Sequence, residues 1–173
     1  MATWTTPKTW VEGYLVDEDD LNEQLRDNLD ALKEPPTDSY VCDEASDYTT
    51  TSTSFVDVDA TNLSLTITTT GGDVMVGFFG TVEHSAASSN AIRFDVDLDG
   101  SVIGGDAGLA GMNFSVSDQR LTVSFVYLVT GLSAGTHTFK LQWETASATA
   151  TLFAGSGHAT FDVHPQFWVR EVS

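Results

Sequence analysis

Residues Ala91–Gly100 read AIRFDVDLDG, and this stretch decides the fold class. Its aspartates and glycine have the spacing of the first half of an EF-hand calcium loop: Asp95, Asp97, Asp99 and Gly100. Its apolar residues, however, alternate strictly with its polar ones, which is the period of a half-buried strand. An EF-hand loop lies between two helices, whereas residues 101–111 contain too many glycines for a helix. The stretch therefore predicts a β-strand that ends in a tight turn at Asp99 and Gly100.

Similar alternation recurs from about residue 45, where Thr, Val and Phe become abundant and glycines follow at short intervals. The strand-like segments are residues 48–59, 63–70, 74–84, 91–99, 120–132, 137–145, 148–154 and 159–172. Roughly eight strands at short spacing, with no helix between them, indicate an antiparallel sandwich or barrel. We expect residues 40–173 to form one mainly β domain, an antiparallel jelly-roll sandwich. An immunoglobulin-like sandwich is the alternative, although its Cys…Trp…Cys pattern is missing from the sequence.

Residues 1–36 have a different pattern, and we expect an extended arm followed by one α-helix over residues 18–33. Leucines four, four and three residues apart form one stripe along this helix: Leu21, Leu25, Leu29 and Leu32. Asp17 or Asp19 can cap its N-terminus, and the prolines at positions 35 and 36 end it. A stripe this narrow suits a seam against one neighbour, which is the chain's own domain, a sister chain or a larger assembly.

Three aromatic residues precede this helix in the arm: Trp4, Trp10 and Tyr14. Aromatic side chains bury a large area and often anchor interfaces. We expect these residues and the leucine stripe to form an interface with other chains. The alternative is that the aromatic residues fold back on the chain's own domain.

The chain is strongly acidic, because 7 Lys and Arg stand against 25 Asp and Glu and give a formal net charge of −18. Such a chain repels nucleic acids and anionic membranes, so neither is expected as a partner. The composition resembles the surfaces of proteins from halophiles, where concentrated salt screens the self-repulsion. The N-terminal residues lack the apolar core of a signal peptide, so we expect synthesis in the cytoplasm. Cys42 is the single cysteine, so no disulfide can form within the chain.

No motif of a catalytic or cofactor site stands out in the sequence. The histidines are not spaced as metal ligands, and no GxSxG, P-loop or GxGxxG motif occurs. We therefore expect a protein that is not an enzyme and needs no cofactor. Aspartates near the predicted turn could still gather a structural calcium or potassium ion, and the candidate ligands are Asp97, Asp99 and Asp106.

The segment TWVEGYLVDEDDLNEQLRDNLDALKEPP (residues 9–36) resembles the N-terminal segment of many structural proteins of tailed viruses and prophages. Those proteins begin with a Trp, a Gly and a short hydrophobic step, followed by a helix of the type LNxxLRDNLxAL. The matching residues here are Trp10, Gly13, Leu21, Asn22, Leu25, Arg26, Asp27, Asn28, Leu29, Ala31 and Leu32. The C-terminal part resembles the jelly-roll domains of phage head-decoration, fibre and tail proteins, in LQW at residues 141–143 and in the closing strand FWVRE at residues 167–171.

This resemblance implies a structural protein of a tailed virus particle, in which residues 1–36 join the β domain to capsid or tail proteins. Such jelly rolls commonly assemble around a three-fold axis, so the resemblance also implies a homotrimer. The protein would be made in the host cytoplasm and reside in the virion. Together with the acidic composition, the resemblance suggests that the host is a haloarchaeon.

Two other functions stay open from the sequence. A receptor- or glycan-binding fibre tip would stack an exposed aromatic on a host-surface glycan, and Trp143 and Tyr127 are the candidates. A glycan hydrolase would need two carboxylates that face each other across a cleft.

Overall fold

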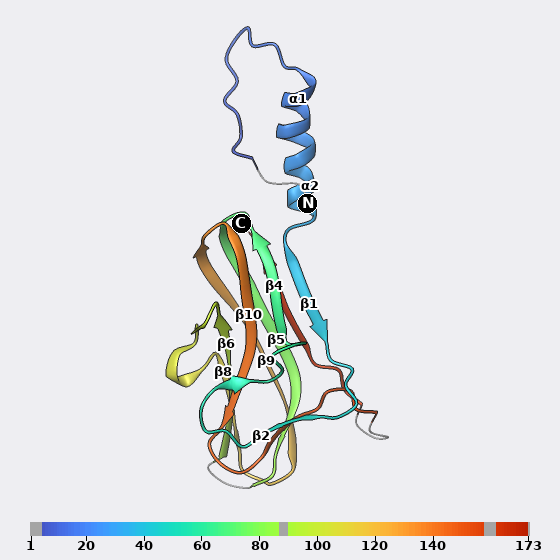
Figure 1. Cartoon of the computed structure of the whole chain (residues 1–173), viewed down its shortest axis with the longest axis vertical. Coiled ribbons are helices and arrows are strands. Elements are labelled where there is room, and N and C mark those ends of the chain that lie inside the picture. The colour runs from blue at the N-terminus through green and yellow to red at the C-terminus, as the bar shows by residue number, and fades with distance from the viewer. Residues whose placement is uncertain (1–4, 87–89, 158–161, 173) are drawn as a thin grey trace.

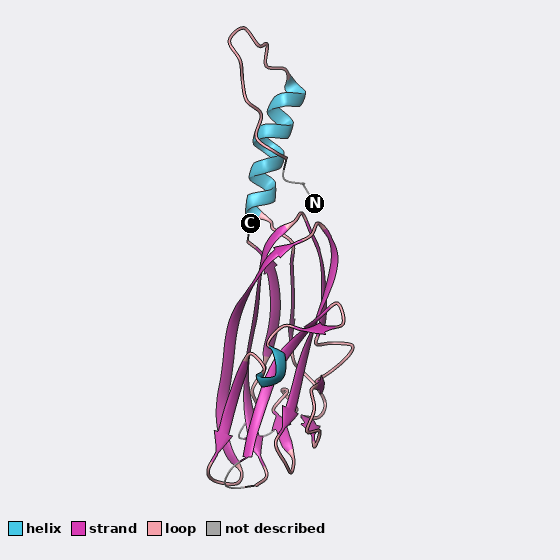
Figure 2. Ribbon diagram, turned by 90° about the vertical axis from the view of Figure 1, so that its left-hand side faces the viewer, coloured by secondary structure: helices cyan, strands magenta, loops and turns pink. Residues whose placement is uncertain are grey.

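The computed structural model describes residues 5–86, 90–157 and 162–172. Figure 1 shows an elongated β sandwich with a helix projecting from one end. Extended chain that precedes the helix runs back along it, and Figure 2 shows the same arrangement after a quarter turn. The molecule therefore has two regions, a sandwich and a projection.

The described residues form one projecting helical segment, one short 3-10 turn and twelve strands. The helical segment comprises α1 (Glu18–Leu21), the π-helical η1 (Asn22–Asp27) and α2 (Asn28–Lys33). The strands are β1 (Thr37–Val41), β2 (Tyr48–Thr50), β3 (Val56–Asp57), β4 (Ser64–Thr69), β5 (Gly72–His84), β6 (Asn90–Leu98), β7 (Ser101–Val102), β8 (Ala110–Phe114), β9 (Gln119–Leu132), β10 (Gly135–Thr145), β11 (Ala150–Leu152) and β12 (Gln166–Glu171). The 3-10 turn η2 (Gly105–Ala107) lies between β7 and β8.

These strands form two antiparallel sheets. The main strands of the first sheet have the order β1-β12-β5-β9, and the short β11 and β2 continue beside the end of β5. The second sheet has the order β4-β10-β6-β8, and the short β3 and β7 extend it. The main strands change sheet at every step along the chain except from β6 to β8, which is jelly-roll connectivity. The predicted fold class, a mainly β jelly-roll sandwich preceded by an arm and a helix, is confirmed.

The core lies between the two sheets and is built from alternating residues of each strand. In β10, Phe139, Leu141 and Trp143 face inward as predicted, and each is at most 1% exposed. Phe94 of β6 packs against Phe78 of the first sheet, with ring centroids 5.0 Å apart, and against Trp143 at 6.0 Å. Burying one such large apolar side chain contributes about 1.5–3 kcal/mol, so these rings hold the two sheets together.

Residues 91–100, from which the fold class was predicted, form a strand and a tight turn. Residues 90–98 form β6, and β7 follows directly after the turn. Asp99 has φ 52° and Gly100 has φ 91°, which are the left-handed conformations that a two-residue hairpin turn requires. The prediction of a hairpin is confirmed, and the EF-hand alternative is wrong because strands, not helices, flank the turn.

The predicted helix over residues 18–33 is confirmed. Asp17 caps it, since its Oδ1 accepts a hydrogen bond from the backbone N of Asp20 at 2.9 Å. The middle turn, Asn22–Asp27, is π-helical rather than α-helical.

Three parts of the sandwich differ from the sequence prediction. The first sheet begins at Thr37, before the expected domain start at residue 40, because β1 pairs with β12 directly after Pro36. Residues 48–59 are not one strand, since they pair only in β2 and β3. Residues 110–114 form the unexpected strand β8, whose Gly and Asn lack an alternating apolar pattern.

The two ends of the sandwich carry different turns. The end beside the helix holds the β4–β5 turn, where Gly71 has φ 98°. At this end the backbone N of Glu171 donates a hydrogen bond to the carbonyl O of Pro36 at 2.9 Å. The opposite end holds the β8–β9 turn, where Asp118 has φ 58° and the next residue pairs with the end of β5.

Candidate functional site

The arm and the helix form one unit, residues 5–33, which we call the projecting unit. Polar contacts hold the arm on the helix. Lys8 Nζ lies 2.5 Å from Asp20 Oδ1, and the Tyr14 hydroxyl donates to Asp20 Oδ2 at 2.7 Å. The backbone N of Thr5 donates to Asn28 Oδ1 at 2.8 Å. Hydrogen bonds with Lys8 and then Tyr14 lower the pKa of Asp20, so its carboxylate is ionised in this contact.

The apolar side chains of the projecting unit are exposed to solvent. Their exposed fractions range from 41% for Tyr14 to 89% for Leu15. The exposed set comprises Trp10, Val11, Tyr14, Leu15, Val16, Leu21, Leu25, Leu29 and Leu32. The leucine stripe is therefore not buried on the chain's own domain, which removes that alternative for the single chain. Trp10 and Tyr14 contact each other, with ring centroids 5.4 Å apart, whereas Trp4 lies outside the described residues.

The outer face of the first sheet carries further apolar side chains. Val74, Val76 and Phe78 of β5 face the core, so the residues between and beside them face outward. Four outward side chains on β1, β5 and β12 form what we call the apolar strip: Val41, Met75, Phe79 and Trp168. The indole of Trp168 lies over Gly77, since a Cβ at Gly77 would be 2.3 Å from the ring.

A groove of about 930 Å³ joins the projecting unit to the apolar strip. Leu32, Pro35 and Pro36 line it from the base of the helix, and Met75, Trp168 and Arg170 line it from the sheet. Leu32, the last leucine of the stripe, therefore lies beside the outer face of the first sheet.

Arg170 differs from the other cations of the chain. The sequence has 7 Lys and Arg, and all of them lie within the described residues. Six form ion pairs within the chain: Lys8, Arg26, Lys33, Arg93, Arg120 and Lys140. Arg170 is exposed and pairs with no described carboxylate, although the chain has 25 acidic residues. The groove thus has a mainly apolar lining that also contains Glu171, and Arg170 in it pairs with no carboxylate among the described residues.

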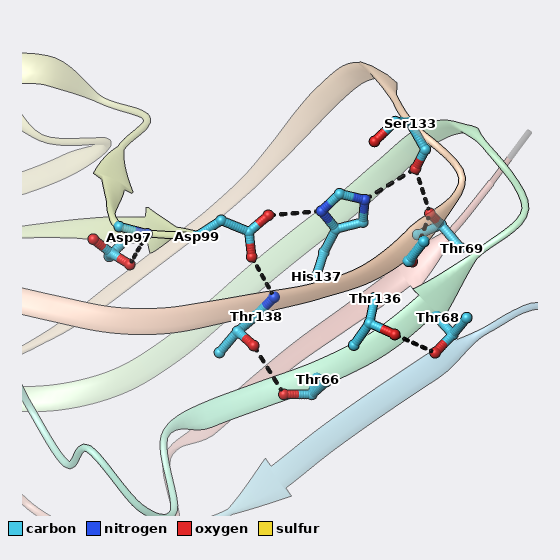
Figure 3. A network of polar contacts seen from close by, with 11 residues as sticks. Thr66, Thr68, Thr69, Asp97, Asp99, Ser133, Thr136, His137 and Thr138 are labelled. Carbon is cyan, nitrogen blue, oxygen red and sulfur yellow. Dashed lines mark hydrogen bonds and ion pairs between the residues drawn. The ribbon is translucent and has the colours of Figure 1, made fainter.

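The outer face of the second sheet is polar by contrast. Threonine hydroxyls pair across its strands, Thr66 with Thr138 at 3.2 Å and Thr68 with Thr136 at 3.1 Å (Figure 3). Such hydroxyl pairs satisfy each other and stay hydrated, so this face needs no covering partner.

His137 joins the β6–β7 turn to the β9–β10 turn (Figure 3). Its Nδ1 lies 2.7 Å from Asp99 Oδ2, and its Nε2 lies 2.9 Å from the carbonyl O of Ser133. Both neighbours are acceptors, so both hydrogen bonds require the doubly protonated imidazolium. The hydrogen bond to Asp99, then that to Ser133, raises the pKa of His137.

The aspartates predicted as cation ligands do not form a cluster. Asp97 Oδ1 accepts a hydrogen bond from the backbone N of Gly100 at 2.9 Å, and Asp99 is held by His137 and Thr138. Asp106 is exposed on η2. Within the described ranges, no group of three or more His, Cys, Asp and Glu is placed to hold a metal ion.

Among the aspartates of residues 91–100, Asp95 has a structural role that was not expected from the sequence. It is fully buried, and its Oδ1 accepts hydrogen bonds from the backbone N of Val96 at 2.7 Å and of Gly104 at 2.8 Å. Burial raises its pKa. Asp95 thereby fastens the loop that contains η2 to the sheet, and only the spacing to the following glycines hints at this.

Trp143 is excluded as a sugar-stacking residue of the fibre-tip hypothesis, because it is 1% exposed in the core. Tyr127, the other candidate, is 40% exposed on β9. Its chain neighbours Val126 and Leu128 are also exposed, but they face away from the Tyr127 ring because successive side chains of a strand point to opposite faces.

No model of a known protein family matches the chain, and no curated protein is similar to it in sequence. No described helix is long and apolar enough to cross a membrane.

Among solved structures, the chain is similar to Eiger TNF of S. frugiperda, at 9% identity over 81% of this chain and 95% of that one, with a TM-score of 0.48. It is also similar to the structure of the infectious bursal disease virus Gx strain, at 14% identity over 79% of this chain and 35% of that one, with a TM-score of 0.46. A third likeness is to the globular domain of zebrafish complement 1qA, at 14% identity over 81% and 98% of the two chains, with a TM-score of 0.43. At these identities and TM-scores the likeness concerns the arrangement of strands and says nothing of what the chain does.

Proposed function

We propose that the chain is a non-enzymatic structural protein of a tailed virus particle, with a haloarchaeon as host. The projecting unit attaches it to another protein of the capsid or tail. The sandwich stands away from this attachment and is presented as a homotrimer. The resemblance of residues 9–36 to attachment segments of such proteins supports this assignment.

The observation that carries the proposal is the exposed apolar surface of the projecting unit. Its arm is held to its helix by polar contacts, and its leucines and aromatics point to solvent. A contiguous exposed apolar surface marks a contact with another molecule. The helix projects away from the sandwich (Figure 1), and its Leu21, Leu25 and Leu29 are 48%, 55% and 62% exposed, so the surface that covers them belongs to another chain.

The charge of the chain agrees with an attached protein that faces water. A net charge of −18 keeps copies soluble at high local concentration, while concentrated salt screens their repulsion. Many copies on one particle also turn weak individual contacts into strong overall attachment.

The proposal is tested by incorporation into particles that are produced without the wild-type chain. The variant L21Q/L25Q/L29Q keeps good helix formers but removes three exposed leucines, so we expect its incorporation to fall about tenfold or more. The control E23Q/D30Q changes two exposed polar residues of the same helix and should incorporate like the wild type. Equal incorporation of the leucine variant and the wild type would overturn the proposal.

A further inference from the structure

The outer face of the first sheet is one continuous surface that crosses all four of its main strands. The pairing of β1, β12, β5 and β9 places the outward side chains of these strands in rows, because residues directly opposite each other point to the same side. Two neighbouring rows are Ser39, Trp168, Gly77 and Val126, and Val41, Gln166, Phe79 and Ser124. None of these positions carries an ionisable side chain, so we call them the uncharged rows.

The uncharged rows are open to solvent in the single chain. Val41, Phe79 and Val126 are 51%, 44% and 60% exposed. Between them the indole of Trp168 lies over Gly77, so an aromatic ring fills the place where that position has no side chain. A contiguous exposed apolar surface of this kind marks a contact with another molecule.

The second sheet shows that the absence of charge is particular to this face. There the outward residues of β10 and β6 also lie opposite each other, and successive pairs each contain a charged side chain. These pairs are Lys140 with Asp97, Gln142 with Asp95, and Glu144 with Arg93. A chain of net charge −18 therefore keeps charge on one of its sheets and leaves it out of the middle of the other.

The charged residues that border the uncharged rows are paired or buried, except for Arg170. Towards the end away from the helix, Glu83 and Arg120 pair with each other at 3.0 Å. Towards the helix, Glu171 lines the groove but is 3% exposed, and its Oε1 accepts hydrogen bonds from the backbone N and the Oγ1 of Thr70 at 2.9 Å. Arg170 is exposed at this margin, where it can pair with a carboxylate of a neighbouring chain.

We propose that copies of this chain associate through the uncharged rows, which each copy turns towards a shared symmetry axis. This rests on the proposed function, because it assigns the surface of the homotrimer proposed there. Near a symmetry axis, a side chain meets the same side chain of the other copies. A charge of either sign would there repel its own copies, so a surface for self-association needs uncharged side chains. A surface for a different, charged partner has no such need.

The direction of the projecting unit also agrees with copies that stand side by side. The long strands of the first sheet run along the long axis of the molecule, and the helix projects from one end (Figures 1 and 2). A symmetry axis parallel to these strands therefore places every projecting unit at the same end of the assembly. All copies can then attach to one particle surface. Leu32 of the helix lies on the same side as the rows, since it lines the groove together with Trp168.

The first test is the mass of the full chain in molar KCl by light scattering. We expect about three times the 18.6 kDa of one chain. The variant F79T/V126T keeps residues suited to strands but removes apolar side chains from both rows, and we expect its mass to fall threefold, to one chain. The control V102T/V116T makes two exposed apolar residues elsewhere polar and should keep the wild-type mass. A monomeric wild type, or a row variant of wild-type mass, would overturn the inference.

A second test adds a charge to the rows without removing an apolar side chain. In S124D the new carboxylate is enclosed between copies and faces its own equivalents, so we expect the protein concentration at half-association to rise about tenfold or more. A dilution series followed by light scattering measures this concentration. The control S115D changes the net charge equally at an exposed serine outside the rows. Equal half-association concentrations for the two variants would contradict contact through the uncharged rows.

The outcome for this inference is distinct from that for the proposed function. The helix variant L21Q/L25Q/L29Q tests attachment to the particle, and it leaves the uncharged rows intact. Loss of incorporation with an unchanged mass supports both assignments. A chain that is monomeric but still needs its leucines for incorporation would contradict the association through the rows alone.

Discussion

The sandwich and the projecting unit bury opposite kinds of side chain. The sandwich encloses Phe94 and Trp143 and presents threonines to water on its second sheet. The projecting unit encloses Asp20 and Asn28 and presents leucines and aromatics. A domain with an apolar inside is stable alone, whereas a unit with an apolar outside is completed by a partner. One region of the chain therefore encloses its apolar side chains, and the other exposes them, which is the basis of the attachment that we propose.

The largest expected effect is a difference in the free energy of unfolding between one substitution in the sandwich and one in the projecting unit. Phe94→Ala leaves a cavity between the sheets and should lower the free energy of unfolding by about 3–5 kcal/mol. Leu25→Ala removes a side chain that is 55% exposed and should change it by no more than about 0.5 kcal/mol. Denaturant titration of dilute protein measures both. Similar losses at the two sites would break the comparison.

A second substitution tests whether close packing in the sandwich extends to the outer face of its first sheet. Gly77→Ala places a Cβ 2.3 Å from the Trp168 ring, so the indole must move off the sheet. We expect a loss of about 1–3 kcal/mol and a change in tryptophan fluorescence. Gly131→Ala is the control, because nothing lies within 4 Å of its added Cβ and only its φ of 67° is strained. An unchanged emission spectrum for Gly77→Ala would contradict the placement of Trp168.

The pH dependence of stability is a smaller effect and should arise in the sandwich. The pKa of His137 is raised in the folded chain by Asp99 and Ser133. Its contribution is therefore complete below the unfolded pKa of about 6.5 and is lost as the pH rises through the folded pKa. We expect the denaturation midpoint to fall over this range. His137→Gln should remove this part of the pH dependence, and a midpoint that still falls equally would exclude His137 as its source.

The smallest expected effect lies in the projecting unit. Hydrogen bonds to Asp20 and then Tyr14 raise the pKa of Lys8, and these contacts hold the arm on the helix. Lys8→Gln should speed amide hydrogen exchange in residues 5–16 while leaving the sandwich amides and the thermal midpoint unchanged. Lys33→Gln is the control, since Lys33 pairs only with Glu34 at 3.7 Å. Equal exchange in the two variants would show that other contacts hold the arm.

The sequence predicted those elements whose pattern is local. Alternation in β6 and β10 and the leucine period of the helix each determine one element and its buried or exposed side. The strands β1 and β8 were missed because they depend on partners distant in the chain, β12 and β6. In these strands the backbone pairing outweighs a weak residue pattern.

The candidate surface was only half predictable for the same reason. The exposed leucines and aromatics of residues 10–32 follow from spacing along one helix and its arm. The apolar strip joins Val41, Met75 and Trp168, which only the register of three strands brings together. Arg170 could not be recognised either, because its lack of a partner becomes visible only when the other six cations are seen to be paired.

The opposite ends of the sandwich give the molecule a direction that can be used for display. A peptide inserted into the β8–β9 turn at Asp118 would emerge at the end of the sandwich away from the projecting unit. The same peptide inserted into the β4–β5 turn at Gly71 would emerge beside the helix, next to the groove that Gly71 lines. Exposed turn tips tolerate such insertions best, so the β8–β9 turn is the place to carry an antigen or a targeting peptide on this scaffold.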